Sequence, residues 1–190
     1  MITSFNDLLP LLPLLIVTAT SVIAMLMIGI RRSYIATGSI AITGLLAATL
    51  VAVSMMGWTN QQVTPLLIID QYSLLFTVVV CASAMVLAVL SFPYFFELDD
   101  QREEYFLLLT VATIGAIVMV SSNHFVSTVL GLETLSMSLY GMIAYPLHSA
   151  KSAKFPLEAS VKYLVLSAAA SGFILFGMAL IYAQTGTLSF

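Results

Sequence analysis

Six long runs of apolar residues dominate the chain, and short polar stretches separate them. Each run is long enough to cross the hydrocarbon core of a bilayer, which takes about 17 to 25 residues in a helix. The strands of a transmembrane β-barrel would instead be about ten residues long and would alternate in polarity. The pattern therefore predicts an all-α, polytopic membrane helix bundle. The six predicted transmembrane helices are 8–30, 35–57, 72–92, 105–121, 124–145 and 159–183.

The composition supports a membrane location. Of the 190 residues, 61% are hydrophobic and 8% are charged, and the mean hydropathy is +1.08. Soluble domains carry about 25% charged residues, so this chain is expected to have the lipid bilayer as its solvent. The net charge of −3 provides no basic patch, which argues against nucleic acid as a partner. Cys81 has no second cysteine to pair with, which excludes a disulfide framework.

The basic residues between the predicted helices gather on one side of the membrane. They lie after the first, third and fifth helices: Arg31, Arg32, Arg102, Lys151 and Lys154. These three connections face the same side because successive helices alternate in direction, while both tails and the remaining connections carry no Lys or Arg. By the positive-inside rule, the basic side is the cytoplasm. Both termini are therefore predicted to lie on the non-cytoplasmic side.

Glu133 lies near the middle of the fifth predicted helix, too deep for its short side chain to reach the interface. Placing a carboxylate there costs about 2.5 to 3.5 kcal/mol on the insertion scale. Hydrocarbon disfavours the charged form of a carboxyl group, and a nearby cation favours it. Glu133 is therefore a candidate proton site that switches as neighbouring cations move. The alternative is that it forms a hydrogen bond to a neighbouring helix and only fixes packing.

Lys162 lies about one turn inside the sixth predicted helix, so its ammonium group can reach the cytoplasmic interface. By helical rise, Glu133 lies roughly 12 Å deeper than Lys162. A link between the two would need water, Ser136 or Ser138, or a tilted helix. Glu158, four residues before Lys162, is a local alternative partner. No nucleotide loop, zinc-ligand spacing or hydrolase triad occurs, so we predict no catalytic, cofactor or metal site.

Three segments carry a resemblance to a known family. They are residues 123–136 with the run LGLETLS, residues 157–163 with LEASVKY, and residues 167–171 with SAAAS. Together they resemble the start of the antiporter-like module in the membrane subunits of respiratory complex I (NADH:quinone oxidoreductase). With the LLPLL run near the amino terminus, the similarity is greatest to the bacterial subunit N family. It extends over essentially the whole chain.

The resemblance implies a fold built from two inverted repeats. Residues 1–103 would form an amino-terminal three-helix segment, and residues 104–190 would begin the first repeat. Glu133 matches the family's glutamate on the fifth helix, and Lys162 matches the lysine at the opening of the sixth. Both would belong to a proton pathway.

The implied function is that of a non-redox, membrane-arm subunit of a translocase, which contributes to proton translocation coupled to quinone reduction. NADH, FMN, iron–sulfur clusters and quinone would be bound by other subunits, with no cofactor in this chain. Its partners would be the other membrane-arm subunits and the lipid bilayer, in the inner (cytoplasmic) membrane of a bacterium.

The chain departs from the family at its end. It stops at Phe190, before the family's broken seventh helix, the lysine on that helix and the second repeat. We therefore expect a partial chain or an interrupted reading frame that is inactive alone. Two alternatives remain open: a subunit of a multisubunit cation/proton antiporter, and a purely structural membrane scaffold.

Overall fold

A computed structural model describes residues 5–57, 61–96, 103–145 and 154–190. Within these residues a 3₁₀-helix, η1 (Phe5–Leu11), is followed by six α-helices. They are α1 (Leu12–Ile30), α2 (Tyr34–Ser54), α3 (Gln71–Phe96), α4 (Glu103–Val120), α5 (Phe125–Ala144) and α6 (Lys154–Thr185). Each α-helix contains a stretch long and apolar enough to span a bilayer. The prediction of an all-α, polytopic membrane bundle is confirmed.

Two helices are longer than predicted, and each contains a proline. α6 begins at Lys154 because Pro156 falls in its first turn, where a missing N–H has no partner within the helix. Lys154 is therefore part of the helix and does not belong to the preceding loop. α3 continues through Pro93 to Phe96. Beside this proline, the Tyr34 hydroxyl of α2 donates a hydrogen bond to the Phe92 carbonyl, which ties α2 to this part of α3.

The connection between α2 and α3 contains two short strands that the apolar pattern does not reveal. β1 (Gln61–Gln62) and β2 (Ile68–Ile69) pair antiparallel. The Ile68 N–H also donates to the Ser121 carbonyl at 2.9 Å, and the Asn123 N–H donates to the Leu66 carbonyl at 2.9 Å. Backbone groups near a bilayer need protein partners. These bonds attach the connection to the turn between α4 and α5.

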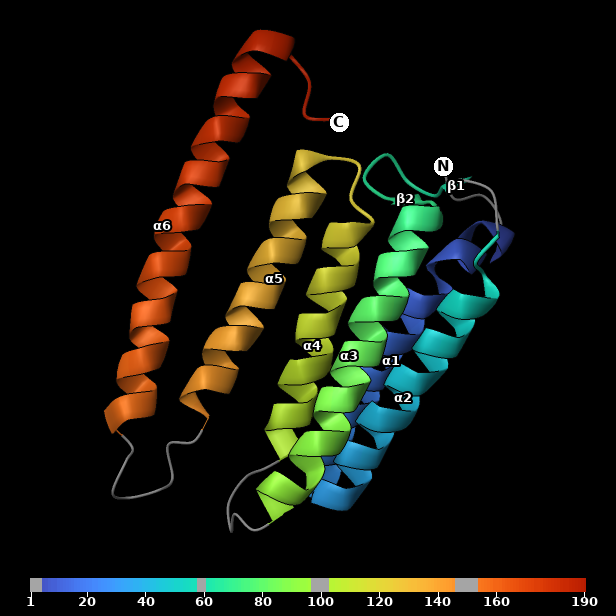
Figure 1. Ribbon diagram of the computed structural model, residues 1–190, viewed down its shortest axis with the longest axis vertical. Coiled ribbons are helices and arrows are strands. Elements are labelled where there is room, and N and C mark those ends of the chain that lie inside the picture. Colours follow the sequence, from blue (N-terminus) through green and yellow to red (C-terminus); the bar gives the residue numbers. More distant parts are fainter. Residues whose placement is uncertain (1–4, 58–60, 97–102, 146–153) are drawn as a thin grey trace.

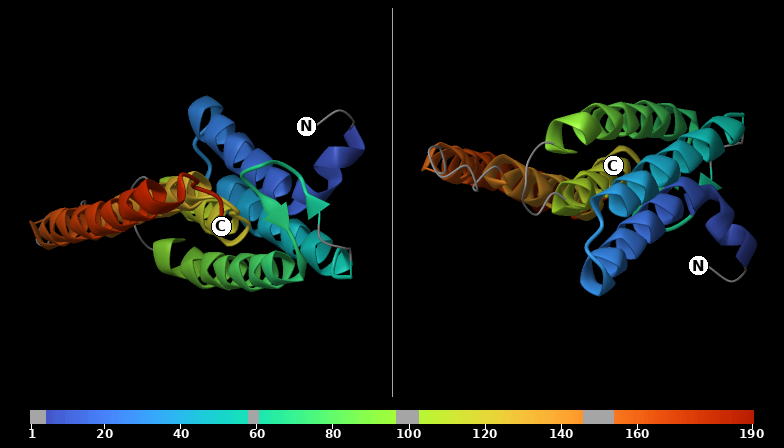
Figure 2. Two further views of the ribbon diagram at one scale, coloured as in Figure 1. Left: turned by 90° about the horizontal axis from the view of Figure 1, so that it is seen from above. Right: turned by 90° about the horizontal axis from the view of Figure 1, so that it is seen from below.

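The four helices α1–α4 form the core of the molecule. Val17, Leu45, Cys81 and Phe106, one from each helix, are fully buried together. α5 packs on α4, and α6 packs on α5. Figures 1 and 2 show that α5 and α6 extend from the α1–α4 bundle to one side, as an arm.

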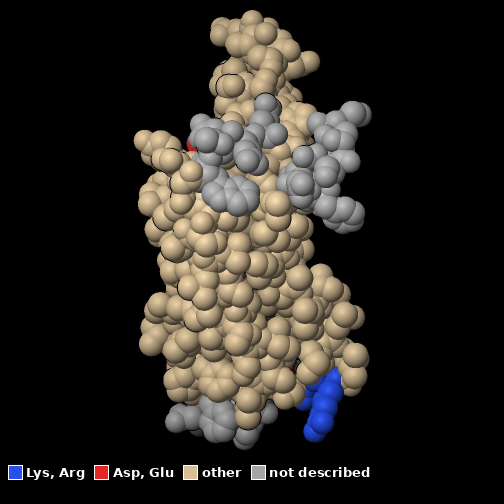
Figure 3. Space-filling view, turned by 90° about the vertical axis from the view of Figure 1, so that its right-hand side faces the viewer, with Lys and Arg blue, Asp and Glu red and all other residues tan. Residues whose placement is uncertain are grey.

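The first described element, η1, and the residues after α6 lie at one end of the bundle, as six alternating helices require (Figure 1). Arg31 and Arg32 follow α1 at the opposite end. Figure 3 shows one face that is uncharged over most of its length, with basic side chains at its lower end. Arg102 and Lys151, which also contribute to the predicted orientation, lie outside the described residues.

The helices differ strongly in burial. In the most apolar part of α4, 39% of the residues are buried, whereas α6 is exposed almost throughout and Ser171 is its buried exception. α4 contacts α1, α2, α3 and α5, so it joins the bundle to the arm. The division of the chain at residues 103 and 104 stays a prediction.

Candidate functional site

The start of α5 is fixed by His124. This residue is the N-cap, with an extended backbone, and its Nδ1 atom accepts a hydrogen bond from the Val126 N–H at 3.2 Å. Its carbonyl accepts a hydrogen bond from the Ser127 hydroxyl at 2.8 Å. A capped end satisfies backbone donors that have no partner inside the helix. The register of α5, and with it the height of Glu133, is thus set from the non-cytoplasmic end predicted from the sequence.

Two glycines bring the backbones of α4 and α5 into contact. A Cβ atom at Gly131 would lie 2.8 Å from both the Gly115 oxygen and the Met119 nitrogen. A Cβ atom at Gly115 would lie 2.6 Å from the Leu135 nitrogen. Small residues permit such close approach between membrane helices. The crossing lies two residues before Glu133, so it fixes the depth of that carboxyl group along α5.

Glu133 is half-buried in the middle of α5. Among the described residues it makes no hydrogen bond and no ion pair. Ser136 and Tyr140, three and seven residues later, share its face of the helix. These two residues contact α6: the Ser160 hydroxyl donates to the Tyr140 carbonyl at 3.0 Å, and the Ser136 and Ser167 oxygens are 3.5 Å apart. Glu133 therefore lies on the side of α5 that faces α6.

Lys162 is directed away from that face. Its Nζ atom is 2.5 Å from Glu158 Oε1, and its side chain is 70% exposed. α6 contacts α5 through Ser160 and Ser167, and Lys162 lies roughly 160° around the helix axis from Ser160. The structure therefore pairs Lys162 with its local partner on α6 and does not bring it to Glu133.

Depth also separates Glu133 from Lys162, although α6 starts earlier than the sequence suggested. The earlier start of α6 places Lys162 eight residues inside the helix, roughly 12 Å at 1.5 Å per residue. The prediction of about one turn was therefore wrong. The contacts of Ser160 with Tyr140 and of Ser167 with Ser136 set the relative height of the two helices. By this register Glu133 lies five to eight residues further along the axis than Lys162, roughly 8 to 12 Å. Direction and depth both separate the two groups.

The two serines considered as bridges have other roles. The Ser138 hydroxyl donates to the Thr134 carbonyl of its own helix at 2.9 Å. Ser136 is directed at Ser167, as described above. Both serines are buried. Among the described residues, Ser138 bonds within α5 and Ser136 contacts α6, and neither serine connects Glu133 with Lys162.

An ionic cluster at the other end of the bundle was not identified from the sequence. Arg32, after α1, lies 3.2 Å from a carboxylate oxygen of Glu104 in the first turn of α4. The Tyr145 hydroxyl, after α5, donates to the other oxygen of Glu104 at 3.2 Å. Burial raises the pKa of Tyr145, and the negative charge of Glu104 raises it further. The sequence contained an indication of this cluster, because Arg32 and Glu104 both fall on the predicted cytoplasmic side of the membrane.

The upper halves of α5 and α6 diverge around an apolar cleft of about 320 Å³. Leu130, three residues before Glu133, lines this cleft together with Leu175 and Tyr182 of α6. In the part of the chain that the structure describes, no three His, Cys, Asp or Glu side chains are grouped to hold a metal ion. The chemistry available at the site is therefore that of one unpaired carboxyl group between two helices.

The sequence and the fold both have known counterparts. Residues 122–190 match the family described as NADH:quinone oxidoreductase/Mrp antiporter, transmembrane. A chain of respiratory complex I from Thermus thermophilus, solved with bound aureothin, is similar with a TM-score of 0.78 and 26% identity over 93% of this chain. The chain has the fold of an antiporter-like membrane subunit. A chain of an archaeal membrane-bound sulfane sulfur reductase shares this fold, with a TM-score of 0.77 and 23% identity over 96% of this chain.

The similarity to the two solved chains and to the family covers different parts of these proteins. The chain covers 38% of the length of each of the two similar chains. The family match from residue 122 to residue 190 includes all of α5 and α6. The part of the chain with the family's sequence signal is thus the part that carries Glu133 and Lys162.

Proposed function

We propose that the chain contributes to proton translocation as a non-redox, membrane-arm subunit of NADH:quinone oxidoreductase, in the position of bacterial subunit N. The observation that carries the proposal is Glu133: a half-buried carboxyl group in the middle of a membrane-spanning helix, without a hydrogen bond or ion pair among the described residues. Ionisable groups at such depth are expensive and are retained for function. The 26% identity to a complex I chain supports this assignment.

In this proposal Glu133 is the switchable acid. The carboxyl group takes up a proton when cations are distant and releases it when a cation approaches, because the charged form is stabilised by a nearby positive charge. Lys162 lies on the opposite face of α6, where Glu158 is its partner. Lys162 therefore does not pair directly with Glu133. In this proposal it either belongs to a proton path on the side of α6 that faces away from α5, or its charge influences Glu133 from a distance.

The decisive experiment replaces the acid in the full-length, assembled complex. Glu133→Gln keeps the shape of the side chain and removes its ability to ionise. We expect proton pumping into membrane vesicles to fall about tenfold, which corresponds to about 1.4 kcal/mol on a rate, with the assembled complex at the same level. Glu133→Asp should restore part of the activity. Thr134→Ala, next to Glu133 in the sequence and with a hydroxyl group that bonds within α5, is the control. Normal pumping by Glu133→Gln would support the scaffold alternative.

A subunit of a multisubunit cation/proton antiporter is the second candidate, because the matched family includes Mrp antiporters. The two functions differ in what drives the proton. An oxidoreductase subunit supports pumping only when NADH is oxidised and quinone is reduced. An antiporter subunit exchanges Na⁺ or K⁺ for protons in vesicles without either reagent, and that result would replace the first proposal.

The proposed location is the cytoplasmic membrane of a bacterium, with both termini on the non-cytoplasmic side. Thr187 follows α6 at the end of the molecule where η1 lies, and Ser33 precedes α2 at the other end. A cysteine replacing Thr187 should react with a membrane-impermeant thiol reagent added to intact cells, whereas one replacing Ser33 should not. Cys81 is fully buried, so it gives little background. The reverse labelling would invert the orientation.

A further inference from the structure

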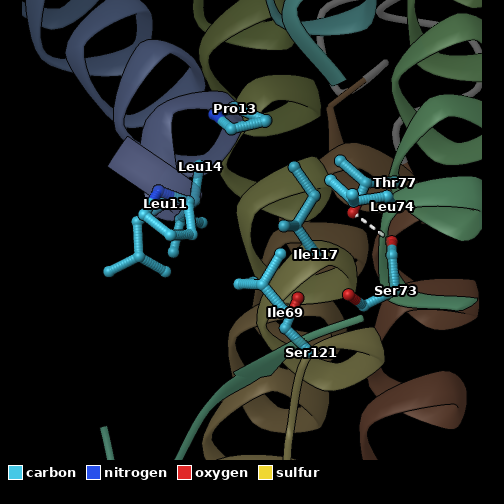
Figure 4. Close-up of a pocket in the computed structure, with 10 residues that line it drawn as sticks. Leu11, Pro13, Leu14, Ile69, Ser73, Leu74, Thr77, Ile117 and Ser121 are labelled. Carbon is cyan, nitrogen blue, oxygen red and sulfur yellow. Dashed lines mark hydrogen bonds between the residues drawn. The ribbon is translucent and has the colours of Figure 1, made fainter. Parts of the chain in front are cut away.

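A small cavity lies between α1, α3, α4 and β2, near the end of the bundle where η1 lies (Figure 4). Its volume is about 10 Å³, close to the minimum of about 10 to 15 Å³ that one water molecule needs. Most of the lining is apolar. Three of the lining residues carry hydroxyl groups: Ser73 and Thr77 of α3, and Ser121 at the end of α4.

Ser121 is the residue that makes this cavity unusual. It is 2% exposed, and its hydroxyl oxygen has no hydrogen-bond partner among the described residues. The backbone of Ser121 is fully engaged, because its N–H donates to the Ile117 carbonyl at 3.0 Å and its carbonyl accepts from the Ile68 N–H at 2.9 Å. Buried hydroxyl groups in proteins almost always have a partner, which is often an ordered water.

The hydroxyl groups of Ser73 and Thr77 determine whether a ligand in this cavity must donate or accept hydrogen bonds. The Ser73 hydroxyl donates to the Asp70 carbonyl at 2.9 Å and accepts from the Asp70 N–H at 2.9 Å. The Thr77 hydroxyl donates to the Ser73 carbonyl at 2.6 Å. Both hydroxyl hydrogens are used, yet each oxygen still has room to accept. Figure 4 shows the Ser73 and Ser121 hydroxyl groups facing each other across the cavity. A ligand there must donate to α3.

The ligand must also be small and neutral. The residues that line the cavity include no carboxylate and no basic group. A buried cation would therefore lack a compensating charge, which makes its desolvation costly. A molecule larger than water does not fit the volume. Water can accept the hydrogen of Ser121 and donate its own two hydrogens to the oxygens of Ser73 and Thr77, which is the usual number of bonds for a buried water.

We propose that one ordered water molecule is bound in this cavity, between the hydroxyl group of Ser121 on α4 and those of Ser73 and Thr77 on α3. Ser121 also holds Ile68 through its carbonyl. The water thus extends the hydrogen bonds that attach the α2–α3 connection to the end of α4. This inference does not depend on the proposed function.

The direct test is a structure of the intact complex at a resolution that shows ordered water. We expect one peak at roughly 2.7 to 3.2 Å from Ser121 Oγ and from at least one hydroxyl oxygen on α3. Absence of the peak, with the Ser121 hydroxyl turned onto the Ile117 carbonyl, would overturn the proposal. So would density that changes when Na⁺ in the buffer is replaced by a heavier cation, because that would identify an ion.

The variant Ser121→Ala tests for the water independently, because its melting temperature should change in opposite directions with and without bound water. If water is bound, Ser121→Ala removes one of its partners, and the melting temperature should fall by about 2 to 4 °C. If the cavity is dry, the same change removes an unpaired buried hydroxyl group, and the melting temperature should rise, which would contradict the proposal. Ser83→Ala is the control, since the Ser83 hydroxyl of α3 is exposed and bonds within its own helix. It should leave the melting temperature unchanged.

Discussion

The α1–α4 bundle and the α5–α6 arm are similar in hydropathy and different in packing. The span of α6 has a mean hydropathy of 2.3 and is exposed almost throughout, with Ser171 as a buried exception, whereas the less apolar span of α4, at 1.7, is 39% buried. In lipid there is no hydrophobic driving force between helices, so close van der Waals packing decides which helices associate. The two regions show that hydropathy identifies a membrane helix but does not indicate which of its faces the protein covers.

The largest difference in stability between the two regions is expected when an aromatic ring is removed from each. Phe106 of α4 is fully buried, and its ring lies 5.5 Å from that of Tyr34 and 6.1 Å from that of Phe92. Phe106→Ala should lower the free energy of unfolding by about 3 to 5 kcal/mol. Phe173 of α6 is 79% exposed, and Phe173→Ala should change it by less than about 0.5 kcal/mol. Unfolding in mixed detergent, followed by circular dichroism, measures both values; equal effects would refute the contrast.

Adding a methyl group should separate the contact between bundle and arm, at Gly131, from the exposed part of the arm, at Gly177. Gly131→Ala places a Cβ atom 2.8 Å from backbone atoms of α4, which cannot move aside as a side chain can. It should destabilise the protein by about 1 to 3 kcal/mol. Gly177 of α6 has nothing within 4 Å of such an atom. Gly177→Ala should therefore stabilise the helix by about 0.5 to 1 kcal/mol. The same unfolding assay tests the pair, and a stabilising Gly131→Ala would show that the helices are not in contact there.

The hydrogen bond of Tyr145 to Glu104, which links the arm to the bundle, should contribute less to the free energy of unfolding, and its contribution should depend on pH. Tyr145→Phe removes the hydrogen bond to Glu104 and should cost about 0.5 to 1.5 kcal/mol near neutral pH. The pKa of Tyr145 is raised in the folded protein above its ordinary value of about 10. Its stabilising contribution is therefore complete below pH 10 and is lost as the pH rises above that value.

Melting curves of wild type and Tyr145→Phe between pH 7 and pH 11 measure this contribution. The difference between the two proteins should be constant up to about pH 10 and should then decline. A constant difference over the whole range would show that the raised pKa does not contribute to stability.

The smallest effect is expected for the ion pair of α6. Lys162 and Glu158 are four residues apart, and their side chains are 70% and 48% exposed. A double-mutant cycle with Lys162→Ala and Glu158→Ala should give a coupling of about 0.3 to 0.5 kcal/mol. A coupling of several kcal/mol would mean that the pair is buried by protein in the assembled complex, and α6 would then no longer differ from the bundle.

The apolar pattern was sufficient to predict the six helices, and it was less informative about their ends. The predicted sixth helix, 159–183, leaves Pro156 outside, although a first turn accepts proline. The start of α6 in turn set the predicted depth of Lys162, which was too shallow. The two strands before α3 were missed because they are held by backbone bonds to the end of α4, and such bonds leave no trace in side-chain hydropathy.

For the candidate site, the sequence predicted the depth of Glu133 but could not predict which way its neighbours point. The interhelical contacts of Ser136 and Ser160 decide which face of α6 is turned to α5, and serine is too common in membrane helices for spacing alone to reveal them. Gly131 carried a clearer signal, since glycine inside a helix is unfavourable unless a close approach requires it. The roles of Glu133 and Lys162 in a proton pathway stay predictions.

The attachment of α6 at two heights constrains how the arm can move. Near one end, the Ser160 hydroxyl is bonded to α5; near the other, the chain folds back so that the Phe125 N–H donates to the Leu188 carbonyl at 2.9 Å. The rings of Phe125 and Phe190 also meet, with centroids 4.8 Å apart. Rotation of α6 about its own axis would break the Ser160 bond. The ammonium group of Lys162 therefore stays turned away from the carboxyl group of Glu133 for as long as that bond is in place.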